Sequence, residues 1–290
     1  MPESLTIQEV VARTTRWFRD RGIETARLDA ELLAAFACGI RRLDLYLSPE
    51  RPLTPDERDR LRELVRRRGQ GEPVAYLRGH REFHGLDLRV TPAVLIPRPE
   101  TETLVDAALE WLAAFGGPSP RVADVGTGSG AIAAALAAAC PSAHVVAVDV
   151  SDDALAVAAD NVAALGLAGR VTLVKSDLLA SVPADPPLDA VVSNPPYVAE
   201  SERDLLDRSV REYEPPLALF SGPEGTDHTA RLAAQAFDRL RPGGALFVEI
   251  GTPPQRDRVA ALLAARFGEG AVTPLPDLAR VVRGFRATKA

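Results

Sequence analysis

The motif Asn-Pro-Pro-Tyr at residues 194–197 combines side-chain and backbone groups suited to holding a planar amino group. Two successive prolines fix the backbone and remove two N–H donors, which leaves the carbonyl acceptors of this stretch facing outward. Asn194 adds a side-chain carbonyl acceptor, and Tyr197 adds a ring that can stack on a planar group. Two acceptors that take both hydrogens of an NH2 group direct its nitrogen at an incoming electrophile. The motif therefore predicts chemistry on the nitrogen of a planar amide or exocyclic amine.

A glycine-rich stretch, Gly126 to Gly130, follows a short apolar run and precedes an alanine-rich helical pattern. Glycine permits the unusual dihedral angles of such a turn and lets a ligand approach bare backbone. The N-terminus of the helix that follows offers free N–H groups. With Ala131 the stretch also fits G-x-G-x-x-G/A, the dinucleotide fingerprint. The glycines therefore predict a nucleotide-type cofactor but do not distinguish NAD from S-adenosylmethionine.

Two aspartates accompany the glycine-rich stretch. Asp149 ends the second predicted strand, 23 positions after Gly126, and a carboxylate there can accept both hydroxyls of a ribose, which NAD and S-adenosylmethionine share. Asp124 lies inside the first predicted strand, where a charge costs free energy unless it is paired. We expect Asp124 to hold the glycine loop or to meet the amino group of the cofactor, with a hydrogen-bonded structural acid as the alternative.

The elements that must position these motifs alternate between short apolar runs and helical patterns. The predicted strands are 121–125, 143–149, 171–175, 188–193 and 244–249, and the predicted helices are 101–115, 129–139, 152–165, 227–240 and 254–267. The apolar runs lack period-2 alternation, which is typical of parallel strands buried on both faces. Alternating strands and helices predict an open, doubly wound α/β sheet, whose ligands bind beyond the carboxyl ends of its strands. Both motifs therefore face one crevice.

The sequence indicates three successive regions along the chain, and the third contains the α/β pattern. Residues 1–71 show helical patterns and no strand signal, with the start of one helix marked by Thr54 and Pro55. Residues 72–97 form a connector, in which the alternation around Gly85 predicts a β-hairpin. Residues 98–290 hold the α/β pattern. The stretch 198–226 is long for a loop without periodicity, which favours a functional role.

Composition excludes several protein classes. The 290 residues carry a net charge of −6, which disfavours a duplex nucleic-acid partner because such proteins usually show a basic patch. The chain has no apolar run of about 20 residues and no signal-peptide pattern at its N-terminus. Its two cysteines cannot make a disulfide framework, and no motif with metal-ligand spacing occurs. We expect a cytoplasmic protein without a metal ion and without a membrane or nucleic-acid partner.

These motifs together resemble the PrmC/HemK family of protein-(glutamine-N5) methyltransferases, which modify peptide-chain release factors. The resemblance extends from about residue 72 to the C-terminus. It rests on EPVAYLRGHREFHGLDLRV at 72–90, LIPRPETETLV at 95–105, DVGTGSGAIA at 124–133, VSNPPYV at 192–198 and EPPLALFSGPEGTDH at 214–228. Residues 1–71 are similar to the family only as a helical domain of about the right length.

The resemblance implies a Rossmann-like methyltransferase domain at 98–290 and a helical, partner-recognising domain at 1–71. It implies that S-adenosylmethionine contacts Gly126, Thr127, Gly128, Ser129, Gly130, Asp149, Leu178 and Asn194. Leu178 stands where some relatives carry an aromatic residue near the adenine. It further implies that the glutamine of a Gly-Gly-Gln loop is held by Asn194, Pro195, Pro196 and Tyr197, with Asn194, Pro195 and Tyr197 as the catalytic residues.

The reaction expected from this arrangement is a single in-line displacement, in which the amide nitrogen attacks the sulfonium methyl group. Proximity and alignment supply most of the acceleration, about 7–11 kcal/mol. The charged residues Arg98, Glu100 and Glu102 either line the pocket or belong to a solvated helix start. The segment 275–284 departs from the family pattern, and we assign it no function.

Three other functions fit parts of this pattern. An amino-methyltransferase for adenine would use the same acceptor motif, but it would require base flipping and a basic groove. A non-enzymatic binding protein would bind a partner tightly without turnover. An NAD oxidoreductase would bind nicotinamide and has no need for the acceptor motif.

Overall fold

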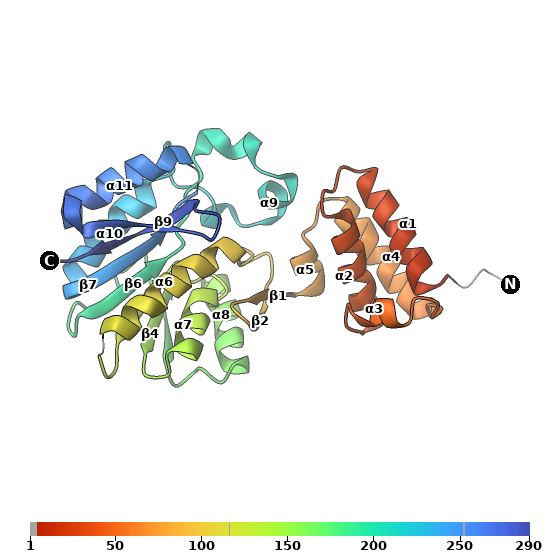
Figure 1. Cartoon of the computed structure of the whole chain (residues 1–290), viewed down its shortest axis with the longest axis horizontal. Coiled ribbons are helices and arrows are strands. Elements are labelled where there is room, and N and C mark those ends of the chain that lie inside the picture. Colours follow the sequence, from red (N-terminus) through yellow and green to blue (C-terminus); the bar gives the residue numbers. More distant parts are fainter. Residues whose placement is uncertain (1–4, 116, 252) are drawn as a thin grey trace. The chain divides into compact units, whose positions relative to one another are not determined.

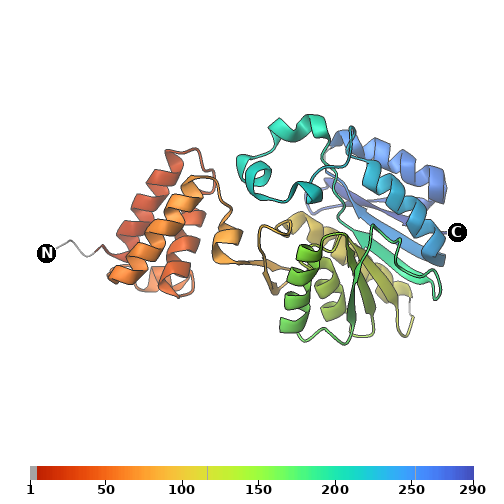
Figure 2. The same ribbon diagram turned by 180° about the vertical axis from the view of Figure 1, so that it is seen from behind.

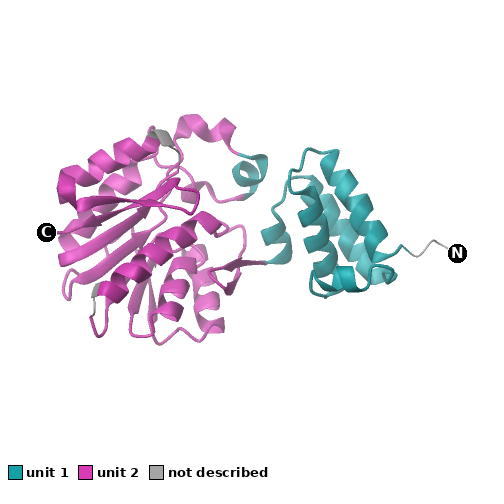
Figure 3. Ribbon diagram, in the orientation of Figure 1, with its two compact units in different colours: residues 1–79, 207–213 teal, residues 80–206, 214–290 magenta. Residues whose placement is uncertain are grey.

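The computed structural model describes residues 5–115, 117–251 and 253–290. The chain divides into two units (Figure 3). Unit 1 consists of Met1–Gly79 together with Asp207–Tyr213, and unit 2 consists of His80–Leu206 together with Glu214–Ala290. The domain limits that the sequence suggests at residues 71 and 97 stay predictions.

Unit 1 is helical. It contains α1 (Ile7–Arg19), α2 (Ala26–Cys38), α3 (Asp44–Leu47), α4 (Pro55–Gly69), α5 (Val74–Arg78) and α9 (Arg208–Tyr213). The expected start of α4 is confirmed, because the Thr54 side chain accepts from the backbone N–H of Glu57 and the Glu57 carboxylate accepts from that of Thr54. Helix α2 ends at Gly39, whose φ of 64° places it in the left-handed region. The core of unit 1 includes the buried side chains Phe18 and Leu33.

The short helix α9 belongs to unit 1 although it is far from the other helices in the sequence. The hydroxyl group of Tyr213 donates a hydrogen bond to the backbone carbonyl of Gln70 at 3.2 Å. The Tyr213 ring also lies within 3.4 Å of the place where a Cβ atom of Gly71 would stand. The long stretch 198–226, in which the sequence shows no periodicity, therefore contains a helix that packs against the end of the N-terminal helices.

Unit 2 is built on a seven-stranded sheet with the order β5-β4-β3-β6-β7-β9-β8 (Figure 1). Its strands are β3 (Arg121–Val125), β4 (His144–Asp149), β5 (Val171–Lys175), β6 (Leu188–Ser193), β7 (Leu240–Glu249), β8 (Val272–Pro276) and β9 (Val282–Thr288). The first five are parallel, whereas β9 pairs antiparallel with both β7 and β8. The predicted parallel α/β sheet is confirmed.

Helices cover both faces of this sheet, as Figures 1 and 2 show. One face packs against α6 (Pro99–Phe115), α7 (Ala131–Ala139) and α8 (Asp152–Ala164), and the other against α10 (Asp227–Arg239) and α11 (Pro253–Phe267). Successive residues of one strand pack on opposite faces of the sheet. In β3, Val122 belongs to the hydrophobic core on the α6, α7 and α8 side, and Ala123 to the core on the α10 and α11 side. Burial on both faces explains why these strands lack period-2 alternation.

Several predicted boundaries and elements differ from the structure. The predicted helix 129–139 begins at Ala131, because Gly130 has a φ of 79° and cannot continue a right-handed helix. Strand β7 begins at Leu240 rather than at residue 244. The strands β8 and β9 are absent from the sequence prediction, because β8 contains Pro274 and Pro276 and lies at the edge of the sheet, where proline is tolerated.

The expected hairpin is present as β1 (His80–Phe83) paired antiparallel with β2 (Leu86–Arg89). It is tied to the sheet domain by Asn161 in α8, whose side chain accepts from the Arg89 backbone N–H at 2.7 Å and donates to the Arg89 carbonyl at 2.9 Å. The same side chain donates to the Ser129 carbonyl at 2.8 Å. In the part of the chain that the structure describes, no helix combines the length and apolar character needed to cross a membrane.

Candidate functional site

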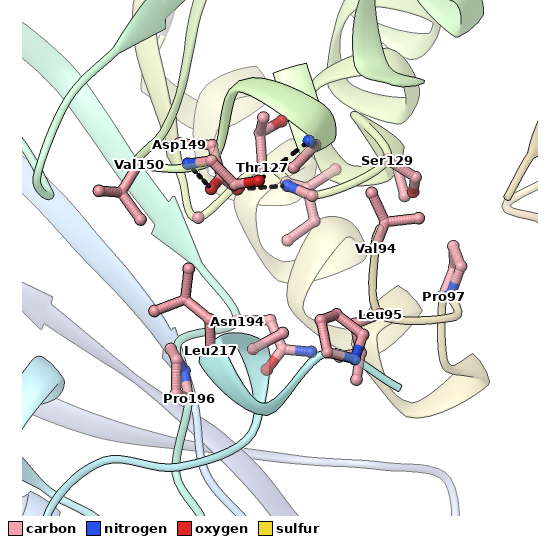
Figure 4. Close-up of a pocket in the computed structure, with 18 of the residues that line it drawn as sticks. Val94, Leu95, Pro97, Thr127, Ser129, Asp149, Val150, Asn194, Pro196 and Leu217 are labelled. Carbon is pink, nitrogen blue, oxygen red and sulfur yellow. Dashed lines mark hydrogen bonds between the residues drawn. The ribbon is translucent and has the colours of Figure 1, made fainter. Parts of the chain in front are cut away.

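A pocket in unit 2 lies at the carboxyl ends of four parallel strands (Figure 4). The predicted site residues that line it are Gly126, Thr127, Gly128 and Ser129 after β3, Asp149 at the end of β4, Leu178 after β5, and Asn194 and Pro196 after β6. Figure 4 shows Thr127 and Asp149 on one side of the pocket and Asn194 and Pro196 on the other. The remaining predicted residues, Gly130, Pro195 and Tyr197, are not among the lining residues.

The glycine loop at the end of β3 is held open by backbone hydrogen bonds. The N–H groups of Gly126 and Thr127 both donate to the Val148 carbonyl at 2.9 Å. Gly126 and Gly128 have φ values of 72° and 53°, in the region that favours glycine. A Cβ atom at Gly128 would meet nothing within 4 Å, so this backbone faces open space. The loop thus presents bare backbone to the pocket, as the sequence predicts.

Gly130 differs from Gly126 and Gly128 because it packs against a neighbouring helix. A Cβ atom there would lie 3.3 Å from the Cβ atom of Ala158 in α8. Its φ of 79° also turns the chain into α7. Gly130 therefore allows α7 and α8 to approach each other, and it does not line the pocket.

Two buried or half-buried carboxylates brace the loop. Asp149 accepts from the N–H of Gly128 at 2.9 Å and from that of Ser151 at 3.0 Å. Asp124 is completely buried, and its Oδ2 accepts from the Thr127 hydroxyl at 2.6 Å and from the Ala133 N–H at 2.9 Å. Burial raises the pKa of Asp124 to about 7. Of the two roles expected for Asp124, the structure supports bracing of the glycine loop.

Leu178 and His228 form part of the wall beyond β5, where the chain leaves the sheet. Leu178 has a φ of 52°, which is uncommon for a residue with a side chain. His228, at the start of α10, bonds through Nδ1 to the Ser221 hydroxyl at 2.8 Å, and that oxygen also accepts from the His228 N–H at 2.9 Å. Burial, followed by the charge of Arg231, lowers the pKa of His228 and favours the neutral ring. No sequence signal identifies this histidine.

The acceptor motif follows β6 directly. Asn194 is half-buried, and its Nδ2 donates to the Thr101 hydroxyl oxygen at 3.1 Å. Its Oδ1 is buried and has no hydrogen-bond partner among the described residues. A buried acceptor without a partner is costly unless a ligand satisfies it. Asn194 therefore has the free acceptor that the sequence predicts.

Tyr197 does not line the pocket, and its ring packs against Gly251. A Cβ atom at Gly251 would clash with the Tyr197 ring, so the absence of a side chain there leaves room for the ring. The backbone carbonyl of Tyr197 accepts from the side-chain amide of Gln255. Burial, followed by the negative charge of Glu249, raises the pKa of Tyr197 to about 12. Tyr197 is partly buried, and its stacking on a substrate stays a prediction.

Thr101 and Glu249 adjoin the motif and carry no recognised sequence signal. Thr101, in the first turn of α6, lines the pocket and is 4% exposed. Glu249, the last residue of β7, is also 4% exposed, and its Oε2 has no hydrogen-bond partner among the described residues. Burial raises the pKa of Glu249 to about 7, whereas a hydrogen bond from Thr101 acts in the opposite direction.

The charged residues Arg98, Glu100 and Glu102, at the start of α6, have separate surroundings. Arg98 lines the pocket and forms an ion pair with Glu214, which is buried. Glu102 accepts a hydrogen bond from the His84 N–H at 3.0 Å and so holds the hairpin turn. Glu100 is exposed. Among the described residues, no group of three or more His, Cys, Asp or Glu side chains is placed to hold a metal ion.

Two family models match the chain. The model described as PrmC N-terminal domain matches residues 9–79, and the one described as Methyltransferase small domain matches residues 103–212. A release factor glutamine methyltransferase of Rhodopirellula baltica is 46% identical over 91% of this chain and 89% of its own length. Another, of Chlorobaculum tepidum, is 42% identical over 98% of both chains.

Solved structures show the same fold at lower identity. The 16S rRNA N2 G1207 methyltransferase RsmC of T. Thermophilus, solved with AdoMet and guanosine, has a TM-score of 0.54 at 23% identity and covers 73% of this chain and 50% of its own. The hMettl16 catalytic domain in complex with an RNA hairpin has a TM-score of 0.56 at 18% identity, with coverages of 72% and 77%. At these identities the likeness concerns the fold alone.

Proposed function

This chain belongs to the family of release factor glutamine methyltransferases, and we propose that it methylates the side-chain amide nitrogen, N5, of the glutamine in the Gly-Gly-Gln loop of a peptide-chain release factor. The methyl donor is S-adenosylmethionine. The observation that carries the proposal is the buried, unpartnered Oδ1 of Asn194 beside the pocket that the glycine loop lines.

The residues of the pocket fit the cofactor. Gly126 and Gly128 present bare backbone where a side chain would intrude, and Asp149 stands at the end of β4, where a carboxylate can take ribose hydroxyls. Each Asp149 oxygen already accepts one backbone hydrogen bond and keeps a further lone pair. Leu178 and Val150 add apolar side chains to the pocket lining. S-adenosylmethionine supplies a methyl group on a positively charged sulfur.

Asn194 orients the substrate in this proposal. An amide nitrogen is a poor nucleophile because its lone pair is delocalised into the carbonyl group. The Oδ1 of Asn194 and the Pro195 carbonyl accept its two hydrogens and fix the direction of the lone pair. The reaction is then an in-line displacement. The bond from nitrogen to the methyl carbon forms as the methyl–sulfur bond breaks, S-adenosylhomocysteine leaves with the bonding electrons, and the nitrogen loses a proton to water. Alignment of this kind is worth about 7–11 kcal/mol.

The N-terminal helices recognise the folded release factor in this proposal, while the pocket recognises the glutamine. Unit 1 exposes several large apolar side chains near α3: Leu43 is 61%, Tyr46 51% and Leu47 68% exposed. Clustered exposed apolar residues are typical of protein interfaces. In this proposal an intact release factor also binds this surface, whereas a short peptide presents the glutamine alone.

Transfer of label from S-adenosylmethionine tests the reaction. We would compare a bacterial release factor with the same factor whose loop glutamine is changed to alanine, and assay this chain beside its Asn194→Ala variant. Label on the intact factor alone, with loss of transfer in Asn194→Ala, supports the proposal.

Two outcomes would contradict it. Label on the alanine form would mean that another residue is the acceptor. Label on DNA or RNA, with none on either protein, would favour the adenine methyltransferase that the acceptor motif also fits. Mass spectrometry of the labelled peptide would identify the modified nitrogen.

A further inference from the structure

We propose that Glu249, acting through Thr101, fixes the orientation of the Asn194 side-chain amide and thereby keeps Oδ1 as the acceptor for the substrate. The inference rests on the proposed function, since it concerns how the acceptor for the glutamine amide is held. Thr101 and Glu249 are positioning residues in this account, because neither needs to touch a reacting atom.

The sheet register brings the three residues together. Strands β6 and β7 are parallel neighbours, and Ser193 pairs with Val248. The next residues along the two strands are Asn194 and Glu249, so their side chains leave adjacent strand ends. Thr101, in the first turn of α6, accepts a hydrogen bond from Asn194 and lies close enough to Glu249 to lower the pKa of that carboxyl. The amide, the hydroxyl and the carboxylate therefore form one cluster, in which Thr101 and Glu249 are both buried. In this proposal the cluster is joined by a hydrogen bond from Thr101 to Glu249.

The single hydroxyl hydrogen of Thr101 determines which group donates and which accepts in these hydrogen bonds. An ionised carboxylate can only accept, so the Thr101 hydroxyl donates to Glu249. Its oxygen then accepts from Nδ2 of Asn194 at 3.1 Å. If the Asn194 amide were reversed, its Oδ1 would point at the Thr101 hydroxyl. Oδ1 and the carboxylate would then be two acceptors for the single hydrogen of that hydroxyl, and one of them would lack a donor. The ionised carboxylate thus favours the orientation in which Oδ1 is left free.

The charge state of Glu249 depends on groups from several elements. Burial has the largest effect and raises its pKa to about 7, and Glu100 in α6 acts in the same direction. Arg98, before α6, and Arg283, on β9, act in the opposite direction. Tyr197 lies close enough for its own pKa to be raised by the charge of Glu249. Protonated Glu249 can donate to Thr101, which removes the preference for one amide orientation.

The sequence offers a direct way to observe this. Asn161 and Asn194 are the only asparagines in the chain, so selective 15N-asparagine labelling gives two side-chain amide signals. The Asn161 amide is held by the carbonyls of Arg89 and Ser129 and serves as an internal reference. We expect the Asn194 amide signals to titrate with a midpoint near pH 7 and the Asn161 signals to stay in place.

Two variants test the connection. Thr101→Val keeps the shape but removes the hydroxyl group, and Glu249→Gln removes the titrating carboxyl. We expect both to abolish the titration of the Asn194 signals and to lower kcat by about tenfold or more, the effect of leaving a buried polar group unpaired. Thr101→Ser retains a hydroxyl and should restore both properties. Thr103→Val and Glu110→Gln, in the same helix, are matched controls.

The outcomes separate this inference from the proposed function. If the unaltered protein methylates no release factor, the proposed function fails, but the titration still reports on the hydrogen-bond chain. If the unaltered protein is active and Thr101→Val retains its kcat and its Asn194 titration, the inference is overturned. Affinity for S-adenosylmethionine and urea unfolding, measured on every variant, identify a variant that has merely lost its fold.

Discussion

Glu214 pairs with Arg98 across 116 positions of the sequence, and the other oxygen of its carboxylate accepts a hydrogen bond from the Ile96 N–H at 3.2 Å. The two side chains differ in exposure, since Glu214 is 1% and Arg98 30% exposed. The pair connects the segment before α6 to the segment after α9, and both segments contribute to the pocket wall. The pair therefore holds together two parts of the pocket that the chain itself does not join.

This difference in exposure predicts unequal costs for the two single substitutions. Arg98→Ala leaves a buried carboxylate without its counter-ion and should lower the free energy of unfolding by about 3–5 kcal/mol. Glu214→Gln leaves an arginine that water can reach and keeps an acceptor for Ile96, so we expect a loss of about 1 kcal/mol. Urea unfolding measures both. The double variant should be more stable than Arg98→Ala, and equal losses in the two single variants would contradict this account.

Gly128→Ala is expected to weaken cofactor binding at least tenfold. The substitution places a methyl group on a backbone with a φ of 53° that faces the pocket. Gly166→Ala is the matched control, because Gly166 has a φ of 69° and also faces open space, but it follows α8 and does not line the pocket. Both variants should lose about 1 kcal/mol of stability through backbone strain. Calorimetric titration with S-adenosylmethionine should distinguish them, and a similar Kd for both would count against the assignment of the glycine loop.

Asp124 should make the protein less stable as the pH rises from about 4 to about 7. Its pKa is raised from 3.8 to about 7 by burial, so the folded state binds the proton more tightly than the unfolded state does. The resulting stability is present in full below the unfolded pKa and is lost as the pH rises through the folded one. Asp124→Asn should flatten this part of the profile, measured by urea unfolding between pH 4.5 and 8. Glu249 lowers the stability in the same direction as the pH rises, so some pH dependence remains in the variant. The test therefore compares the slope of unfolding free energy against pH in the unaltered protein and in Asp124→Asn. Equal slopes would contradict the assignment to Asp124.

Substitution of the exposed leucines near α3 should raise KM for an intact release factor and not for a short peptide. Leu43→Ser combined with Leu47→Ser is expected to raise KM several-fold for an intact release factor and to leave KM unchanged for a Gly-Gly-Gln peptide. Both side chains are more than half exposed, so the fold should tolerate the change. Leu278→Ser, at a fully exposed leucine of unit 2, is the control. Equal effects on the two substrates would remove the helical domain from partner recognition.

The sequence by itself determined the elements whose signals are local. Apolar runs without alternation predicted the parallel strands. Thr54 predicted a helix start and the alternation around Gly85 predicted a hairpin, because caps and turns depend on neighbouring residues. The glycine loop and the Asn194 motif could be recognised for the same reason. Their meeting in one pocket followed from the rule that ligands bind beyond the carboxyl ends of parallel strands.

Only the tertiary structure decided which distant residues complete the site. Strand register places Glu249 beside Asn194, and helix α6 brings the Thr101 hydroxyl to the Asn194 amide. Likewise, the antiparallel strands at the sheet edge, the partly buried ring of Tyr197 and the Arg98 pair depend on partners far away in the chain. A lone threonine or glutamate has no local pattern that reveals its partner. Hydrogen bonds and ion pairs between distant segments exist only once the sheet has formed, and for that reason the folded chain was needed to find them.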